Sequence, residues 1–176
     1  MSRASATPSV LCALLLASCA PGAGQTGGRP AEAPRPAESV YTPSVGDMAT
    51  QLYWSDGDSG RINGAPFRLA GIDAPETGGV GSRGGADCEV ERRLGFAAKE
   101  WVVELTRKRW GRGPAVEVTA TDGLDRYGRT AVSLSVDGRP LDRMGVAAGH
   151  YRPWPHRAGR AQGPKPDWCG GSGAGR

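Results

Sequence analysis

Two dipeptides, Asn63-Gly64 and Asp137-Gly138, constrain the fold of this chain more than any other feature. Each stands between two short segments that are suited to form strands, and both of its positions accept the positive φ that tight hairpin turns require. The strands that they predict are 59–62 and 66–72 around the first dipeptide, and 129–136 and 139–140 around the second. Short antiparallel strands are therefore expected to make up much of the fold.

A helical pattern separates the two hairpins. Between residues 89 and 110, apolar side chains recur at helical spacing, namely Val90, Leu94, Ala97, Ala98, Trp101, Val102 and Leu105. Further strands are expected at 49–54 and 115–120, a polar loop at 121–128, and a short second helix at 141–148. Several short strands joined by tight turns favour a small closed barrel, so the predicted class is mainly β with helices, α+β.

The N-terminal region resembles an export signal. An apolar run at 10–17 is shorter than the about 20 residues that a membrane-spanning helix needs. It ends in Leu16-Ala17-Ser18-Cys19, which resembles a lipoprotein signal peptide over residues 1–19, with Cys19 as the lipidated residue. An ordinary signal peptide cut at nearby small residues is the alternative. We expect an exported protein, either secreted or lipid-anchored in the cell envelope at an outer membrane or facing the periplasm, which contacts membrane only through that lipid.

The remaining boundaries follow from composition. Residues 20–43 are rich in Pro, Gly and Ala and predict a disordered tether. Residues 44–169 then form one domain, expected to be monomeric, and residues 170–176 form a Gly-rich tail. If Cys12 leaves with the signal peptide and Cys19 carries lipid, Cys88 and Cys169 remain. Outside the cytoplasm they are expected to form a disulfide; two free buried thiols are the alternative.

Charge is distributed unevenly along the domain. Residues 47–104 carry 10 acidic and 6 basic side chains, whereas residues 105–176 carry 6 acidic and 13 basic side chains. The second half is suited to attract a polyanion, or else forms an ordinary solvated surface. The first half would repel a polyanion unless a cation lies among its carboxylates.

Three short motifs indicate where that cation would bind. They are Asp-Gly-Asp-Ser at 56–59, Arg-Leu-Ala-Gly-Ile-Asp-Ala-Pro-Glu at 68–76 and Asp-Arg-Tyr-Gly-Arg at 125–129. Asp58 and Asp73 are carboxylates suited to share one hard divalent cation. Glu76 is suited to act as a base toward water. The planar forks of Arg68 and Arg129 match a phosphate. Together these groups predict phosphodiester cleavage.

In type, order and spacing these motifs resemble those of the staphylococcal nuclease (thermonuclease) family, over about residues 48–169. The resemblance implies a five-stranded OB-fold-type barrel with a central helix and a short second helix. It also implies a nuclease that depends on Ca²⁺ and hydrolyses single-stranded DNA and RNA, leaving 3′-phosphate ends. The implied Ca²⁺ ligands are Asp58, Asp73 and the Ala74 backbone carbonyl.

The same resemblance implies roles for the other site residues. Glu76 would be the general base or would orient the water, and Arg68 and Arg129 would bind the scissile phosphate. Arg126 and Tyr127 would lie near a terminal phosphate of the nucleotide.

Several alternatives stay open at this stage. The tail lacks the long charged helix of that family, so Tyr151 and Trp154 are candidates either for stacking on bases or for packing. Asp56 and Asp125 are expected to shape turns. Arg68 is also suited to pair with Glu76. The alternative function is a non-catalytic OB-fold lipoprotein that binds nucleic acid or another ligand.

Overall fold

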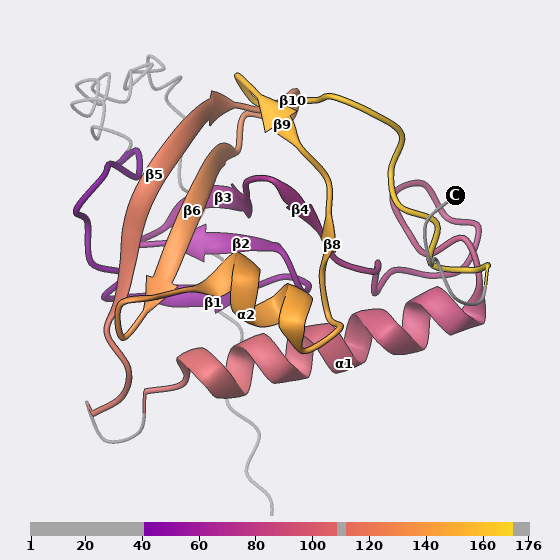
Figure 1. Ribbon diagram of the computed structural model, residues 1–176, viewed down its shortest axis with the longest axis horizontal. Coiled ribbons are helices and arrows are strands. Elements are labelled where there is room, and N and C mark those ends of the chain that lie inside the picture. Colours follow the sequence, from indigo (N-terminus) through magenta and orange to yellow (C-terminus); the bar gives the residue numbers. More distant parts are fainter. Residues whose placement is uncertain (1–40, 109–111, 171–176) are drawn as a thin grey trace, which may run out of the picture. The chain divides into compact units, whose positions relative to one another are not determined.

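The computed structural model describes residues 41–108 and 112–170 (Figure 1). The predicted signal peptide, Cys19 and most of the tether lie outside the described residues. The described part begins slightly before the predicted domain boundary at residue 44. Tyr41 packs against the hydrophobic core, and its hydroxyl donates a 2.7 Å hydrogen bond to Asp47 Oδ2. The folded unit therefore extends into the last residues of the predicted tether.

The main sheet is mostly antiparallel and has the strand order β1-β2-β3-β6-β5, with β7 beside β6. Only the β3–β6 pair is parallel. These strands are β1 (Leu52–Trp54), β2 (Ser59–Ile62), β3 (Ala65–Leu69), β5 (Val116–Leu124), β6 (Thr130–Val136) and β7 (Arg139–Pro140). Two further pairs lie outside this sheet: β4 (Ile72–Asp73) with β8 (Arg152–Pro153), and β9 (His156–Arg157) with β10 (Arg160–Ala161). The α+β class is confirmed, but the described strands do not form a closed barrel.

Backbone hydrogen bonds continue beyond the sheet at its two outer strands. Gly46 N donates to Val118 O at 2.8 Å, and Val118 N donates to Asp47 O at 2.9 Å. Ala49 N donates to Val116 O, also at 2.8 Å. The segment just before β1 therefore lies along the first half of β5, at the opposite edge of the strand order.

Both predicted hairpin turns are present. Asn63 and Gly64 have φ of 49° and 88°, and Asp137 and Gly138 have φ of 49° and 75°, so all four residues adopt the positive φ that their types tolerate. The first hairpin stops at Leu69, because Gly71 turns the chain with a φ of 74° before the separate strand β4. The predicted loop at 121–128 is partly wrong, since β5 continues to Leu124 through two register shifts.

The central helix α1 (Glu89–Thr106) ends before the predicted residue 110; residues 109–111 lie outside the described part. Its buried residues are Glu91, Gly95, Ala98, Val102 and Thr106. Val90 and Leu94, expected on the apolar face, are 43% and 40% exposed, so that part of the prediction is wrong. A Cβ on Gly95 would lie 2.4 Å from Glu76 O. Glycine here allows the helix to approach the backbone of Glu76, the last residue of the second motif, closely.

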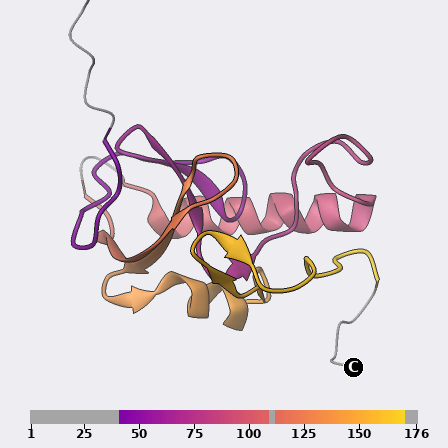
Figure 2. The ribbon, with the colours of Figure 1, turned by 90° about the horizontal axis from the view of Figure 1, so that it is seen from above.

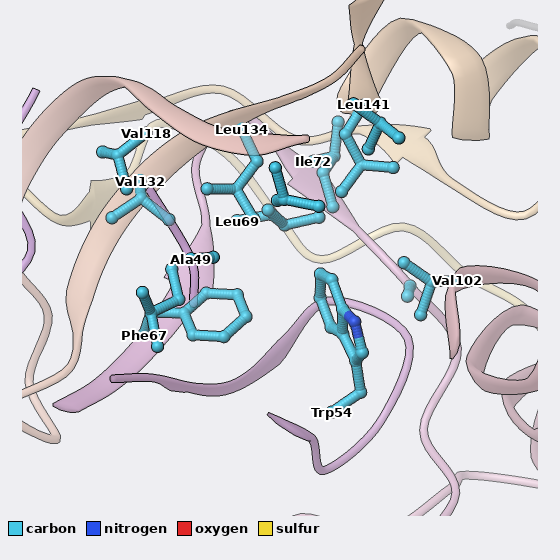
Figure 3. Close-up of a cluster of buried hydrophobic side chains, with 14 of the residues drawn as sticks. Ala49, Trp54, Phe67, Leu69, Ile72, Val102, Val118, Val132, Leu134 and Leu141 are labelled. Carbon is cyan, nitrogen blue, oxygen red and sulfur yellow. The ribbon is translucent and has the colours of Figure 1, made fainter. Parts of the chain in front are cut away.

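The core lies between the sheet and α1. Phe67 of β3 is fully buried, and Trp54 of β1 meets it edge-on with ring centroids 5.1 Å apart. Figure 3 shows these two rings beside the aliphatic side chains of β3 and β6. The Trp54 indole also donates to Thr106 Oγ1 at 2.9 Å, which connects β1 to the end of α1. This packing supports the strands that carry the first two motifs.

The C-terminal segment after α2 (Leu141–Ala147) has no helix of its own in the part that the structure describes. Figures 1 and 2 show that it runs past β8, β9 and β10 and then turns back toward the N-terminal end of α1. There Cys169 forms the predicted disulfide with Cys88, with the two Cα atoms 5.9 Å apart. Within the described ranges, no helix is long and apolar enough to cross a membrane.

Candidate active site

The turn between β1 and β2 presents Asp58. Asp56 Oδ1 accepts hydrogen bonds from Asp58 N at 3.2 Å, Ser59 N at 2.8 Å and Ser59 Oγ at 2.9 Å, so its predicted turn role is confirmed. Gly57 between them is buried, and a Cβ there would lie 2.9 Å from the Ala74 side chain. The first motif is therefore a tight turn that packs directly against the second motif.

Arg68 lies on β3 and is only 9% exposed. Its Nη2 donates to Asp58 Oδ2 at 3.2 Å and to Ile72 O at 3.2 Å. Its guanidinium lies 5.2 Å from the centroid of the Trp154 ring. The alternative in which Arg68 pairs with Glu76 is wrong in this structure, because its carboxylate partner is Asp58.

Asp58 and Asp73 are neighbouring carboxyls, of which Asp73 is buried and Asp58 has a side chain that is 14% exposed. Asp73 is 2% exposed, and Asp58 Oδ2 accepts from the backbone N of Ala74 at 3.4 Å. Burial raises the pKa of Asp58 well above its usual value; the charges of Asp56, Asp73 and Glu76 add to this, and Arg68 opposes it. Both carboxyls are thus held where negative charge is costly unless a cation is close.

Asp73 has a hydrogen-bond donor from the far end of the chain. The Trp168 indole Nε1 donates to Asp73 Oδ2 at 2.7 Å, and both side chains are buried. Burial raises the pKa of Asp73 to about 6, partly offset by the Trp168 hydrogen bond and the positive charge of Lys165. Sequence analysis did not identify either tail residue as part of the site.

Glu76 follows Pro75 and is about one-third exposed, more than either aspartate. Its Oε1 accepts from Lys165 Nζ at 2.8 Å, and its backbone N donates to Glu91 Oε1 at 3.3 Å. Glu91 is 2% exposed, accepts from Asp87 N at 2.7 Å through its other oxygen, and lies 3.4 Å from Lys165 Nζ. The Glu91 carboxylate therefore accepts hydrogen bonds from the residues on both sides of the Gly-rich loop at 77–86, Glu76 and Asp87.

Arg129 comes from the turn between β5 and β6. Asp125 Oδ1 accepts from Tyr127 N at 2.8 Å and Arg129 N at 3.0 Å, while its Oδ2 accepts from Arg129 Nε at 2.8 Å. Burial alone would raise the pKa of Asp125, but these hydrogen bonds outweigh it and the pKa is lowered. The predicted role of Asp125 in shaping the turn is confirmed.

The parallel pairing of β3 with β6 places the third motif beside the second. Thr130 pairs with Phe67 in the parallel β3–β6 ladder, so Arg129 stands at the start of the strand next to the one that carries Arg68. The guanidiniums of Arg126 and Arg129 lie 4.8 and 5.4 Å from the Tyr127 ring centroid, and Tyr127 is 66% exposed. Arg129 itself pairs with Asp125 rather than with the buried carboxyls.

The two stacking candidates of the tail differ. Tyr151 is 2% exposed, its hydroxyl donates to Gly57 O at 2.7 Å, and its ring meets Trp101 edge-on at 5.5 Å. Base stacking by Tyr151 is therefore wrong for this structure, and the residue belongs to the core. Trp154 is half-buried and donates to Gly163 O at 3.0 Å, with Arg68 over its ring.

The donor set suits Ca²⁺. Asp58, Asp73 and the Ala74 carbonyl are hard oxygen donors, which Ca²⁺ prefers, and a cation there would offset the repulsion between the two buried carboxyls. In the parts of the chain that the structure describes, no group of three or more His, Cys, Asp and Glu side chains is placed to hold a metal ion. Water and the backbone carbonyl would have to complete the coordination of a two-carboxylate site.

Comparison with models of known protein families and with curated proteins finds no match to this chain. One sequence signal pointed to the tail residues that had been missed: the expected Cys88–Cys169 disulfide places Trp168 near the start of α1, and hence near the loop that begins after Glu76.

Proposed function

We propose that this protein is a Ca²⁺-dependent nuclease that hydrolyses phosphodiester bonds of single-stranded DNA and RNA and leaves 3′-phosphate ends. The observation that carries the proposal is the meeting of the first two motifs: Arg68 Nη2 lies 3.2 Å from Asp58 Oδ2, which in turn lies 3.4 Å from Ala74 N, next to Asp73. Buried carboxylates, an arginine and a more exposed glutamate are the groups that such a reaction uses.

Each group has a task in the proposed reaction. Asp58, Asp73 and the Ala74 carbonyl would hold Ca²⁺, which when bound would neutralise charge on the phosphate. Glu76 takes a proton from water as the water oxygen bonds to phosphorus. The bond from phosphorus to the 5′ oxygen breaks, and that oxygen takes a proton from solvent. Arg68 and Arg129 stabilise the charge that develops on the phosphate oxygens.

Two ion pairs would have to rearrange for this reaction. Glu76 Oε1 is bound by Lys165, and Arg129 is bound by Asp125. Lys165 engages Oε1 of Glu76, and the Glu76 side chain is 31% exposed, so Oε2 is suited to meet water. The Arg129 side chain is 26% exposed, so its guanidinium is accessible to a phosphate that approaches from solvent.

The fold and the surface support the same proposal. We interpret the hydrogen bonds between residues 46–49 and β5 as the seam of an OB-type barrel, a fold that commonly binds single strands. Arg126 and the exposed Tyr127 would contact a terminal phosphate or sugar beside Arg129. The Cys88–Cys169 disulfide supports export, and a lipid on Cys19 would be the membrane anchor.

The proposal is tested by incubating the purified full chain with a single-stranded DNA and with an RNA, in Ca²⁺ and again with a Ca²⁺ chelator. We expect cleavage of both only in Ca²⁺. The new 5′ ends should accept label from kinase without phosphatase treatment, and the new 3′ ends of the DNA should be extended by terminal transferase only after phosphatase has removed their phosphate. Binding of either strand without cleavage, by a folded and Ca²⁺-supplied protein, would instead identify a non-catalytic binding module.

A further inference from the structure

The C-terminal segment contributes a donor to the candidate metal ligands. The Trp168 indole Nε1 lies 2.7 Å from Asp73 Oδ2 although the residues are 95 positions apart. Trp168 is 5% exposed and Asp73 is 2% exposed, so water does not compete freely for this hydrogen bond. Because the bond engages one carboxylate oxygen, it restricts rotation of the Asp73 side chain and leaves Oδ1 to face another partner.

Independent contacts hold Trp168 in this position. The Arg152 guanidinium lies 4.1 Å from the centroid of the Trp168 ring, and Arg152 is the antiparallel pairing partner of Asp73 in the β4–β8 pair. Arg152 Nη1 also donates to the backbone carbonyl of Asp167. Trp168 is therefore fastened to the same short pair of strands that carries its carboxylate partner.

The disulfide fixes the segment from its other side. Cys169, the next residue, is bonded to Cys88, and Asp167 Oδ1 accepts from Cys169 N at 2.8 Å and Gly170 N at 3.1 Å. Figures 1 and 2 show the tail returning to the N-terminal end of α1, where this bridge lies. The disulfide, the Asp167 hydrogen bonds and the Arg152 contact thus hold residues 167–170 in place, although the Gly- and Pro-rich C-terminal segment forms only short strands.

We propose that Trp168 is a positioning residue for the metal site, which orients the Asp73 carboxylate toward the cation and is held there by the Cys88–Cys169 disulfide. This inference rests on the proposed function, because it assigns Asp73 as a Ca²⁺ ligand. Donors that bind a ligating carboxylate from outside the metal set its orientation, and their loss commonly weakens metal binding about 10- to 100-fold.

Trp168→Phe isolates the indole N–H from the rest of the side chain. Phenylalanine keeps an aromatic face for Arg152 and most of the buried area, but it cannot donate to Asp73. Trp101→Phe is the matched control, because Trp101 is a partly buried tryptophan that packs on the core and whose ring lies against His150 and Tyr151. Both variants are made in the full chain with the disulfide intact.

The measurement is Ca²⁺ affinity by calorimetry in the absence of nucleic acid. We expect Trp168→Phe to weaken binding by about 10- to 100-fold, while Trp101→Phe stays within a factor of two or so of the parent. Equal affinity in Trp168→Phe and the parent would overturn the positioning role and leave the proposed nuclease standing. A parent protein that binds no Ca²⁺ would overturn both the positioning role and the metal site.

A second measurement tests the contact without metal. In the metal-free parent protein, the indole proton of Trp168 should exchange slowly with solvent by NMR, and its resonance should move in Asp73→Asn. Fast exchange of that proton in a folded protein would overturn the proposal. Neither readout depends on nuclease activity. The NMR measurement tests the hydrogen bond itself, and the Ca²⁺ affinities show whether Trp168 positions Asp73 or only stabilises the tail.

Discussion

Arg68 Nη2 lies 3.2 Å from Asp58 Oδ2, and the two side chains are only 11% and 14% exposed. This ion pair joins β3 to the turn after β1. Removing the Arg68 guanidinium would leave the Asp58 carboxyl without its positive partner, although it already experiences the negative charges of Asp56, Asp73 and Glu76. Breaking such a pair from one side costs more than replacing both members, because an unpaired buried charge remains.

We therefore expect Arg68→Met to lower the free energy of unfolding by about 3 kcal/mol at neutral pH. Urea unfolding of the metal-free protein, in chelator, measures it. The double variant Asp58→Asn/Arg68→Met should recover more than half of the loss, because the amide carries no charge. If Arg68→Met were as stable as the parent, the pair would not be the main compensation for Asp58.

The disulfide should contribute strongly to stability because it closes a long loop. Cys88 and Cys169 are 81 residues apart, for which the chain-entropy model gives about 4 to 5 kcal/mol. The double variant Cys88→Ser/Cys169→Ser is the clean test, since Cys88 is the N-cap of α1 and serine is a good N-cap.

That double variant should unfold at a lower urea concentration and should bind Ca²⁺ more weakly, because Trp168 is no longer tethered. Adding a reductant should lower the stability of the parent but not that of the double variant. Unchanged stability of the parent after full reduction of the bridge would show that the other tail contacts suffice.

Asp125 should stabilise the turn that carries Arg129 in a pH-dependent way. Hydrogen bonds from Arg129 and Tyr127 lower the pKa of Asp125 in the folded state, although burial alone would raise it. A lowered folded pKa contributes stability that is present above the unfolded value, about 4, and is lost as the pH falls through the folded pKa.

Asp125→Ala should therefore be less stable than the parent at pH 7, by about 1 to 2 kcal/mol, and this gap should narrow as the pH falls below about 4. Thermal melts from pH 3 to pH 7 measure the gap. The exposed Asp137→Ala would not serve as a control, since Asp137 Oδ1 accepts from Ala115 N; Asp142→Ala on α2 is the better choice. A gap that widened toward low pH would contradict the sign of this pKa shift.

Local turn chemistry made much of the fold predictable. Asn63-Gly64 and Asp137-Gly138 carry their conformational preference within two residues, and both hairpins appear as expected. The start of α1 was also predictable, and Ala98 and Val102 are buried as expected, but the exposed positions in its first turns were not predicted. Val90 and Leu94 follow helical spacing yet face solvent, because Gly95 allows α1 to pack closely on the backbone of Glu76 and Ala98 lies against Gly57.

The candidate site was predictable where its residues fall in the three sequence motifs and not where they come from the tail. Asp58, Arg68 and Asp73 stand at strand ends whose pairing brings them together. Lys165 and Trp168 lie in a segment without periodicity, and only tertiary structure shows that they contact Glu76 and Asp73. Tyr151 was ambiguous for the same reason, since an aromatic residue in an irregular segment is suited to stack or to pack.

The central claim, that Glu76 is the base of a Ca²⁺-dependent nuclease, is tested most directly by Glu76→Gln. One experiment follows cleavage of a single-stranded oligonucleotide across a Ca²⁺ titration for the parent and for Glu76→Gln. Glu100→Gln, an exposed position on α1, is the matched control. For Glu76→Gln we predict that the Ca²⁺ concentration giving half-maximal cleavage stays within a few-fold of the parent value. We predict that its turnover is lower than that of the parent by a factor of about 10² or more. Parent-like turnover by Glu76→Gln would contradict the claim.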